Sequence, residues 1–598
     1  MKWILAESDD RVVALLSEQA GLHPLIARLM VNRSIADPMA ARSFLACDLA
    51  ALSDPALFTH MGKAVSRIRS AIAAGARIIV YGDYDVDGVT GASLLYLTLR
   101  DLGADVGCYI PDRLTEGYGL NAHAVQKIKA SGAGLVITVD CGISNLREAE
   151  LARSLGLDLI VTDHHQFTDP KSKPPNPLEN RVSSELGAQM SDSGAALPDA
   201  CAILHPELIS PEAPSSLRNS VSVLTGVGIA FKLAQALLEL QPDDRNLLRY
   251  LDLVTLGTLA DVGRITGENR ILVKHGLQIL SSDTAAERPG VAALKKVSGL
   301  NGKAIGVGAV GFTLAPRINA SGRLENADVA FRLLTTSSRE EAVDLAATLD
   351  SVNRERQSVE EVIWEAARRH CRQMDAAAKG ALILSSDEWH PGVIGIVASR
   401  IVEEFYRPTA LISVKDGVGK GSARSIPGFD LYKGLAACAD LLTGFGGHTY
   451  AAGFTIAESN IPRFRDRLSS LVLEQFGNQG FVRTLSIDSA VTLNDLTIDL
   501  MRELEKLAPF GQGNPEPRFG ARGLEVLSAR AVGNKHLKLR LRQQGGTAFD
   551  AIAFNRGSLL GNQVRDGARL AVVFTPRLNA WNGKTTVELD IRDIKPDN

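Results

Sequence analysis

The stretch from residue 77 to residue 165 alternates β-branched runs with helix-like segments, and this alternation constrains the fold more than any other feature. Strand-like runs occupy 77–85, 106–112, 135–142 and 157–165, and helix-like runs occupy 91–103, 122–132 and 146–156. Strands that alternate with helices of this length are typical of βαβ units, in which the strands form a parallel sheet. The sequence therefore predicts an α/β domain at this point of the chain.

Polar side chains end three of these runs. The first run leads into Asp83-Tyr84-Asp85-Val86-Asp87-Gly88, the third into Asp140, and the fourth into Asp163-His164-His165. In open α/β sheets, ligands bind at the carboxyl ends of the strands, because the loops converge there on one crevice. A fourth carboxylate, Asp261, follows the helix-like stretch LGTLADV. We expect these groups to meet at one edge of the sheet.

Carboxylates combined with neutral imidazole suit Mn²⁺, Mg²⁺ or Fe²⁺ and also accommodate Zn²⁺. Taken singly, each motif has an ordinary explanation. A DxDxD loop is often a turn or a site for a single Ca²⁺ or Mg²⁺, and a lone Asp at a strand end is often a cap. Together at one sheet edge, these groups are enough for two divalent ions that share a ligand, an arrangement that hydrolyses phosphate esters. The sequence predicts a metal-dependent phosphodiesterase.

The rest of the chain suggests further domains. We expect an N-terminal helical segment (1–60), the α/β domain (61–335), a connecting helix (336–378), a second α/β domain (379–478) and a strand-rich C-terminal domain (479–598). Residues 166–200, with five prolines, predict an irregular surface loop. Residues 339–374 have helical spacing and no Gly or Pro, so they form either one long helix or two helices joined by a polar turn. The C-terminal strands fit a small barrel or a sandwich.

Four motifs resemble those of the DHH phosphoesterase superfamily: GDYDVDG (82–88), TVDCG (138–142), VTDHH (161–165) and GTLADV (257–262). The resemblance implies a site for two Mn²⁺ or Mg²⁺ ions. Carried over motif by motif, it implies the metal ligands Asp83 and Asp85 on one ion, Asp87, His164 and Asp261 on the other, and Asp140 between them. His165 would face the scissile phosphate as a further catalytic residue.

Other motifs narrow the resemblance to the RecJ family of exonucleases within that superfamily. Segments 389–403, 419–425 and 446–453 resemble a DHHA1 substrate-binding domain, whereas 316–327 and 507–519 resemble segments found in the RecJ family itself. The substrate-binding residues implied are Arg317, Arg323, Ser422, Arg424, Gly446, Gly447 and His448. Arginine suits bidentate contacts to phosphate, and paired glycines allow close backbone approach. A tight turn with an exposed His is the alternative for GGH.

The strand-rich C-terminal domain resembles an OB-fold. In HLKLRLR, Leu537, Leu539 and Leu541 fall on one face, which we expect to be core, and Lys538, Arg540 and Arg542 on the other. That second face would be a cationic track for a strand backbone. Trp581, beside the predicted Asn582-Gly583 hairpin turn, is either a base-stacking residue or an ordinary surface aromatic. Residues 481–598 hold 17 Lys and Arg against 13 Asp and Glu, although the whole chain has a net charge of −3.

The resemblance, which covers roughly residues 60–598, implies a single-stranded-DNA-specific 5′→3′ exonuclease that acts in DNA recombination and repair. It further implies contacts with a single-stranded-DNA-binding protein and a RecQ-type helicase, and we expect a monomer. The alternatives are a phosphodiesterase of short oligonucleotides or RNA, and a catalytically inactive DHH scaffold that only binds strands. Scattered cysteines, no signal sequence and no long apolar run indicate a cytoplasmic protein without a membrane span.

Three departures from the family pattern stand out. The segment 166–200 is longer than the usual link after the DHH motif, and His205-Pro206 replaces the usual Asn-Pro. The chain ends soon after the OB-like domain, so we expect no additional C-terminal domain of the kind found in some relatives.

Overall fold

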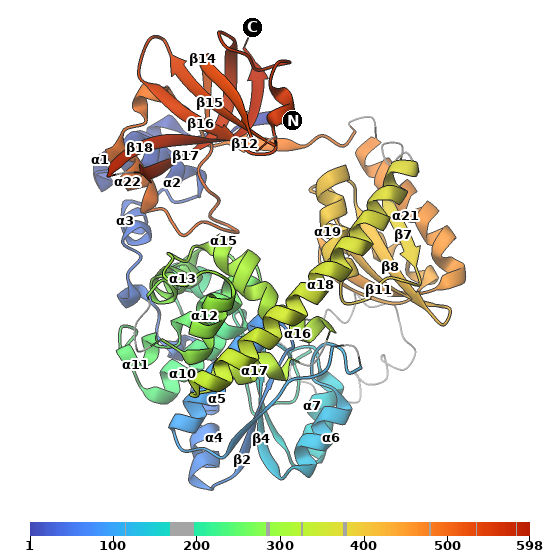
Figure 1. Cartoon of the computed structure of the whole chain (residues 1–598). Helices are drawn as coiled ribbons and strands as arrows, with labels where there is room; N and C mark the ends of the chain where they lie inside the picture. The colour runs from blue at the N-terminus through green and yellow to red at the C-terminus, as the bar shows by residue number, and fades with distance from the viewer. Residues whose placement is uncertain are drawn as a thin grey trace. The chain divides into compact units, whose positions relative to one another are not determined.

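The computed structural model describes the chain except for residues 114, 168–195, 283–286, 325–326, 375–378, 478–479, 534, 582 and 598. It divides into two compact units. Unit 1 combines Met1–Ala51 with Val482–Asn598, and unit 2 comprises Leu52–Phe481. Figure 1 shows both units, in a colour ramp that runs from the N-terminus to the C-terminus.

The first lobe of unit 2 contains the predicted parallel sheet. Its elements are α4 (Met61–Ala73), β2 (Arg77–Gly82), α5 (Val86–Asp101), β3 (Val106–Tyr109), α6 (Ala122–Ala130), β4 (Ala133–Val139), α7 (Leu146–Ser154), β5 (Asp158–Thr162) and β6 (Ala202–Leu204). The strand order is β3-β2-β4-β5-β6, and every pairing is parallel. The predicted α/β fold is confirmed.

Helices cover both faces of this sheet, as its near-continuous apolar strands require. Ile79 and Tyr81 of β2 share a core with residues of α6 and α7, whereas the alternate residues Ile78 and Val80 are equally buried toward the other face. There α4, α5 and α10 (Gly226–Leu238) contact the strands. In Figure 1, α4 and α5 flank the sheet on one side and α6 and α7 on the other.

Helices complete this lobe and lead to the second. They are α9 (Ser215–Val221), α11 (Arg245–Leu248), α12 (Leu251–Ala260), α13 (Gly267–Leu280), α14 (Pro289–Val297), α15 (Val307–Ala309), a π-helical turn (Val310–Leu314), α16 (Ala315–Leu324) and α17 (Asp328–Thr335). The segment after them is one 35-residue helix, α18 (Arg339–Gln373), rather than two helices. The Ser338 hydroxyl caps its start by accepting from the Glu341 N–H. Figure 1 shows α18 spanning from α16 and α17 to α19 of the second lobe.

The second lobe is the second α/β domain that the sequence predicts. It contains β7 (Leu382–Ser386), α19 (Ile394–Phe405), β8 (Thr409–Lys415), β9 (Val418–Arg424), α20 (Leu431–Ala436), β10 (Leu442–Gly447), β11 (Ala451–Ala457) and α21 (Ile461–Phe476). The strand order is β10-β11-β9-β8-β7, and only β7 and β8 are parallel.

Unit 1 contains the C-terminal barrel. Its strands are β12 (Thr484–Ile487), β13 (Ser489–Ala490), β14 (Phe519–Val532), β15 (His536–Gln543), β16 (Ala548–Ala553), β17 (Arg569–Trp581) and β18 (Lys584–Pro596), with α22 (Ile498–Glu505) beside them. The order β14-β15-β16-β18-β17 closes through a β14–β17 pairing, and β16 pairs with β18 in parallel. A closed five-stranded barrel in this order is an OB-fold, as predicted. The β17–β18 register, Trp581 opposite Lys584, gives the expected hairpin.

The N-terminal segment packs on this barrel, which the sequence did not indicate. Its helices α1 (Asp10–Ala20), α2 (Pro24–Asn32) and α3 (Pro38–Ala46) follow the expectation of mostly helical structure. However, β1 (Lys2–Leu5) is a strand that pairs in parallel with β12. Apolar residues of α1, α2 and α3 share one core with the barrel strands. The Arg33 side chain after α2 donates to Asn514 and to the Pro515 carbonyl, and so fixes part of segment 507–519.

Two further expectations concern the surface loop and the absence of a membrane span. Most of the expected surface loop 166–200 lies outside the described residues. Among the described helices, no single one is long and apolar enough to cross a membrane, although the bent pair Ser215–Val221 and Gly226–Leu238 passes such a test by length and composition when the two are joined.

A buried ion pair ties the start of unit 2 to its helices. The Lys232 ammonium of α10 lies 2.7 Å from the Glu268 carboxylate of α13, and neither side chain is exposed. Lys232 also donates to the Ser53 carbonyl, while Glu268 accepts from the Ser53 N–H. Removing one partner would leave the other charge buried without compensation.

We predict that Lys232→Met lowers the stability of unit 2 by about 3–5 kcal/mol, because it leaves the Glu268 charge unpaired. The double variant Lys232→Met/Glu268→Leu should recover most of the loss. Calorimetric melting of wild type, both variants and the exposed-lysine control Lys63→Met measures this. Equal melting of Lys232→Met and Lys63→Met would contradict the prediction.

Candidate metal centre

Three carboxylates lie at the same edge of the parallel sheet. Asp83 directly follows β2, Asp140 follows β4, and Asp163 follows β5. All three residues are almost fully buried, with 1–2% exposure. Asp140 has a left-handed backbone, φ 63°, which few non-glycine residues adopt. Strain of this kind clusters at functional sites and turns attention to Asp140.

The donor atoms form two separate triads of metal-ligating type and a third that overlaps both. Asp83, Asp85 and Asp140 make one of the two, Asp87, His164 and Asp261 make the other, and Asp140, His164 and His165 make the overlapping one. Within each triad, one donor atom per residue lies within 4.8 Å of the others. All six ligands expected from the family motifs are therefore brought together. Their division between two ions follows the same grouping but stays a prediction.

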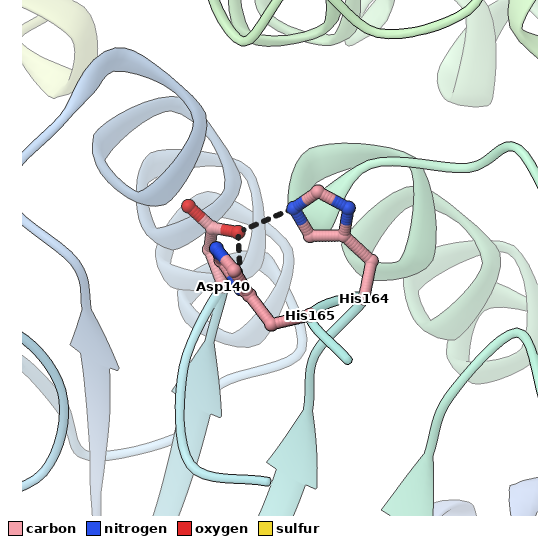
Figure 2. Close-up of side chains that lie close together, drawn as sticks. All are labelled: Asp140, His164 and His165. Carbon is pink, nitrogen blue, oxygen red and sulfur yellow. Dashed lines mark ion pairs between the residues drawn. The ribbon is translucent and has the colours of Figure 1, made fainter. Parts of the chain in front are cut away.

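Asp140 links the two triads. Its carboxylate oxygen lies 3.0 Å from Nε2 of His164 and 3.8 Å from Nδ1 of His165. Figure 2 shows both imidazole rings directed at this one oxygen. His164 Nε2 is in turn 3.8 Å from Asp87 and 3.9 Å from Asp261. Three carboxylates therefore lie within 4 Å of Nε2 of His164, in one cluster of oxygen and nitrogen donors.

The charges of this donor cluster favour the binding of a cation. Burial, and then the charge of neighbouring carboxylates, raises the pKa of Asp83 and Asp140 well above the usual range, that of Asp87 to about 7 and that of Asp261 to about 8. Buried oxygens of Asp83 and Asp140, and Nε2 of His164, have no hydrogen-bond partner among the described residues. Buried polar atoms without partners are costly, so ligation by divalent cations fits them well.

Asp163 holds the DHH loop, residues 163–165 after β5, in place through hydrogen bonds. One of its oxygens accepts hydrogen bonds from the backbone N–H groups of His164 and His165 and lies 2.8 Å from Nδ1 of His165. The other accepts from the N–H of Ile143. Burial opposes ionisation, but these donors lower the pKa of Asp163 to about 2. Asp163 therefore stays charged, orients the His165 ring and fixes the backbone at His164.

The two histidines differ in charge. Burial, together with the neighbouring His165, lowers the pKa of His164 to about 3, which keeps it neutral as a metal ligand must be. Burial also disfavours charge on His165, but its bond to Asp163 outweighs burial and raises the pKa to about 9. His165 is therefore a cation at neutral pH, with Nδ1 directed at Asp163.

Two residues that the site prediction did not include support this loop. The buried His205 has Nε2 2.8 Å from the His165 carbonyl, while its Nδ1 accepts from the Glu207 N–H. The His of His205-Pro206 thus fixes the DHH loop. The Tyr118 hydroxyl lies 2.9 Å from Nδ1 of His165 and donates to the Asp140 carbonyl. A Tyr in a Gly-Tyr-Gly turn gave no signal of this contact.

Close packing of glycines brings the helices up to the carboxylates. At the start of α10, the N–H groups of Gly226 and Val227 donate to Asp87. A Cβ at Gly226 would lie 2.6 Å from the Asp140 side chain, and one at Gly257 would lie 2.8 Å from Asp87. Only glycine permits this approach. The sequence motifs contained Gly257 but gave no reason to single out Gly226.

Arginines gather beside the metal centre. Burial, and then the nearby charges of Arg113, Arg356 and Arg424, lowers the pKa of Arg323 to about 10. Arg323 donates to the Gly392 carbonyl of the second lobe, and Arg424 donates to the Ser422 hydroxyl. Arg356 already pairs with Glu360, but Arg113, Arg323 and Arg424 are partly buried and repel one another, which favours a bound anion and makes this group a candidate phosphate site. Arg113 was not among the predicted residues.

The structure treats two further predicted substrate-binding residues, His448 and Arg317, differently. His448, after Gly446 and Gly447 of β10, has its pKa lowered by burial and then by the charge of His165, so it lies near the DHH loop. Arg317 differs from Arg323. Its guanidinium is 2.9 Å from Asp350 and donates to the Thr313 carbonyl, so its bonding is already internal.

On the barrel, the predicted β15 pattern holds for its core face, since Leu537, Leu539 and Leu541 are buried. On the opposite face, Lys538 lies 3.7 Å from Glu588, and Arg542 pairs with Glu525. Arg540 is exposed. Trp581 ends β17, and its side chain lies outside the described part of the chain.

Comparison with known proteins matches the same three regions. Residues 77–258 match the model of the DHH family, N-terminal domain, residues 378–474 that of the DHHA1 domain, and residues 487–593 that of the RecJ OB domain. Each matched range corresponds to one of the described domains: the parallel-sheet lobe, the second α/β lobe and the barrel.

Relatives match along nearly the whole chain. The single-stranded-DNA-specific exonuclease RecJ of Bacillus subtilis is 37% identical over 99% of this chain and 70% of its own. The protein of the same name in Salmonella typhimurium is 34% identical over 96% of both chains. The crystal structure of RecJ from Thermus thermophilus with Mn²⁺ matches with a TM-score of 0.79 and 31% identity, covering 100% of this chain and 80% of that one. A second structure from that organism, with Mg²⁺, gives 0.72.

We predict that Mn²⁺ raises the melting temperature of the protein, because cations relieve repulsion among the buried carboxylates.

Asp140→Asn should weaken Mn²⁺ binding, measured by calorimetric titration, at least tenfold. The control Asp105→Asn, on an exposed residue just before β3 and hence at the opposite edge of the sheet, should not. Binding should also weaken from pH 8 to pH 6, as protons compete for Asp87 and Asp261. Equal Mn²⁺ affinity in the two variants would contradict the prediction.

Proposed function

The chain belongs to the RecJ family of single-stranded-DNA-specific exonucleases, and on this basis we propose that it removes nucleotides from the 5′ end of single-stranded DNA by two-metal hydrolysis. One observation supports catalytic activity independently of family membership. Six ligand side chains form two triads that meet where Asp140 approaches His164. An inactive scaffold would have no need to keep all six groups together.

The site residues have separate tasks. Two divalent cations, Mn²⁺ or Mg²⁺, supply an activated water and stabilise the oxygens of an in-line displacement when bound. Asp83 and Asp85 would hold one ion and Asp87, His164 and Asp261 the other, and Asp140 is close enough to both sets to serve as a shared ligand. Asp163 keeps the DHH loop in place by accepting its backbone N–H groups.

His165 acts on the substrate rather than on a metal. Because its Nδ1 is directed at Asp163 and its ring is charged, its Nε2 can donate to a phosphate oxygen. A donor there stabilises the charge that develops as the phosphodiester bond breaks. Tyr118 and His205 hold the ring and its backbone in place.

The arginine group positions the strand. Arg323 and Arg424 come from the two lobes of unit 2, and both are partly buried with other guanidinium groups nearby. We assign to them, with Ser422 and His448, the contacts to backbone phosphates beside the metals. Gly446 and Gly447 allow the β10 backbone to approach the strand, and on the barrel of unit 1 we assign further strand contacts to Lys538, Arg540 and Trp581.

Cellular context is proposed from the family alone. The protein would act in DNA recombination and repair as a cytoplasmic monomer, with a single-stranded-DNA-binding protein and a RecQ-type helicase as partners. Co-sedimentation with each purified partner tests the contacts, and light scattering tests the monomer.

We predict that the protein with Mn²⁺ shortens a 50-nucleotide single strand from its 5′ end, because the two triads hold the required ions. A 3′-labelled strand should give a ladder, and a 5′-labelled strand should release labelled nucleotide at once. EDTA and Asp140→Ala should each abolish activity, whereas Asp105→Ala should not.

A 5-nucleotide substrate and a matching RNA digested in parallel separate this function from its alternatives. Preference for the 5-mer or for RNA would favour an oligonucleotide phosphodiesterase. Strand binding without any hydrolysis would favour the inactive scaffold.

Arg323→Met should lower kcat/KM on single-stranded DNA by about 100-fold, since it removes a charged contact worth about 2–3 kcal/mol. Arg317→Met should instead lower the melting temperature, because Arg317 pairs with Asp350. Steady-state kinetics and calorimetric melting of the two variants measure the contrast. A larger kinetic effect for Arg317→Met in a protein that melts like wild type would reverse the assignment.

A further inference from the structure

One arginine beside the metal centre lies on a loop rather than on a helix or strand. Arg323 lies in α16 and Arg424 at the end of β9, whereas Arg113 lies in the segment between β3 and α6. Burial, and then the charge of Arg113, lowers the pKa of both Arg323 and Arg424, so Arg113 lies near both. Its guanidinium carbon is 4.8 Å from the centroid of the Tyr84 ring. A side chain that binds substrate needs a rigid support, which a loop must obtain from its own hydrogen bonds.

The turn that carries Arg113 is closed by hydrogen bonds between Asp112 and Glu116. The Glu116 N–H donates to the Asp112 carbonyl at 2.9 Å, and the Asp112 N–H donates to Oε2 of the Glu116 side chain at 2.8 Å. The N–H and the hydroxyl of Thr115 both donate to the Asp112 carboxylate. The two ends of the turn are therefore joined by reciprocal bonds on either side of Arg113.

The Glu116 side chain also ties this turn to β3 and α6. Its Oε1 accepts from the Tyr109 hydroxyl at 2.7 Å and from the Asn121 amide at 3.4 Å. Tyr109 is the last residue of β3, and its ring stacks on that of the fully buried Tyr81 of β2, 5.4 Å between centroids. Asn121 caps α6 by accepting from the Ala124 N–H. One carboxylate thus connects the turn to two fixed elements.

The part of the segment next to Tyr118 has separate supports. The Gly119 carbonyl accepts from the Tyr81 hydroxyl at 2.8 Å. The Leu120 N–H donates to the Asn145 side chain, whose amide donates back to the Leu120 carbonyl. Tyr118 is therefore held independently of the turn around residue 113.

The charge of Glu116 suits an anchor and not a phosphate ligand. Partial burial opposes its ionisation, but the hydrogen bonds from Asp112, Tyr109 and Asn121 lower its pKa. The carboxylate is therefore negative at neutral pH and accepts all three donors. A negative group repels phosphate, so any effect of Glu116 on substrate binding has to pass through a neighbouring side chain.

We propose that Glu116 is a positioning residue that holds Arg113 at the phosphate-binding group of the site. The inference rests on the proposed function, because it concerns how that site holds the DNA strand. Glu116 acts from behind the turn, by fixing the backbone from which Arg113 extends.

Steady-state kinetics of the full chain with Mn²⁺ on single-stranded DNA test this role. Glu116→Ala should raise KM by about 10- to 100-fold, because a misplaced contact binds the strand poorly. It should leave kcat nearly unchanged, since His165 and Tyr118 have their own supports. Tyr109→Phe, which removes one donor to Glu116, should give a smaller increase of KM.

Two further variants show which property of Glu116 matters. Glu116→Gln should restore most of the affinity, because its amide oxygen accepts from the Asp112 N–H and its NH₂ group donates to the Tyr109 hydroxyl. Glu212→Ala, at an exposed glutamate of the same unit, is the control and should change neither constant. Glu116 borders a surface cavity with Thr115 and Lys127, so the Ala variant leaves the core closed and should bind Mn²⁺ like wild type.

A double-mutant cycle separates positioning from a general structural role. Arg113→Met should raise KM by about as much as Glu116→Ala, and the double variant should raise it little further, because both changes remove the same contact. Multiplied losses in the double variant would overturn the inference, since Glu116 would then act apart from Arg113. A loss in kcat instead of KM, or a Gln variant as defective as Ala, would overturn it as well.

Failure of the proposed function would look different. The wild type would then show no nuclease activity with Mn²⁺. The same cycle, measured as the Kd of a labelled single strand in EDTA, would still decide whether Glu116 acts through Arg113.

Discussion

Mutual repulsion among buried carboxylates is the constraint on which the rest of the structure depends. Asp83, Asp87 and Asp140 have almost no exposed surface, and burial together with neighbouring charge raises the pKa of each. A fold that keeps these groups together without cations loses stability, since each must be protonated or left repelling its neighbours. Three strand ends bring these carboxylates together at one edge of the parallel sheet. Divalent cations bound there would supply the counter-charge.

Much of the surrounding structure holds the carboxylates at this edge of the sheet in place. The N-terminus of α10 gives two N–H groups to Asp87, and the absence of a side chain at Gly226 lets that helix reach Asp140. Asp163 remains ionised because it accepts the N–H groups of the DHH loop, and its bond to His165 keeps that ring charged, whereas burial keeps His164 neutral. One histidine is therefore suited to a metal and the other to a phosphate, although they are adjacent in sequence.

The sequence predicted those parts that depend on local pattern. Strand–helix alternation gave the α/β fold, and residues at strand ends could be grouped because parallel strands share an edge. Contacts between distant segments had no such signal. β1 pairs with β12 across about 480 residues, and only the fold reveals it. Likewise Arg113 lies in a loop whose place beside Arg323 no periodicity encodes.

The most direct test is anomalous diffraction from crystals grown with Mn²⁺. The account predicts two peaks about 3.5–4 Å apart, with oxygens of Asp140 reaching both and His164 ligating one. A single peak, or peaks that lie away from Asp140, would contradict a two-metal centre at this edge of the sheet.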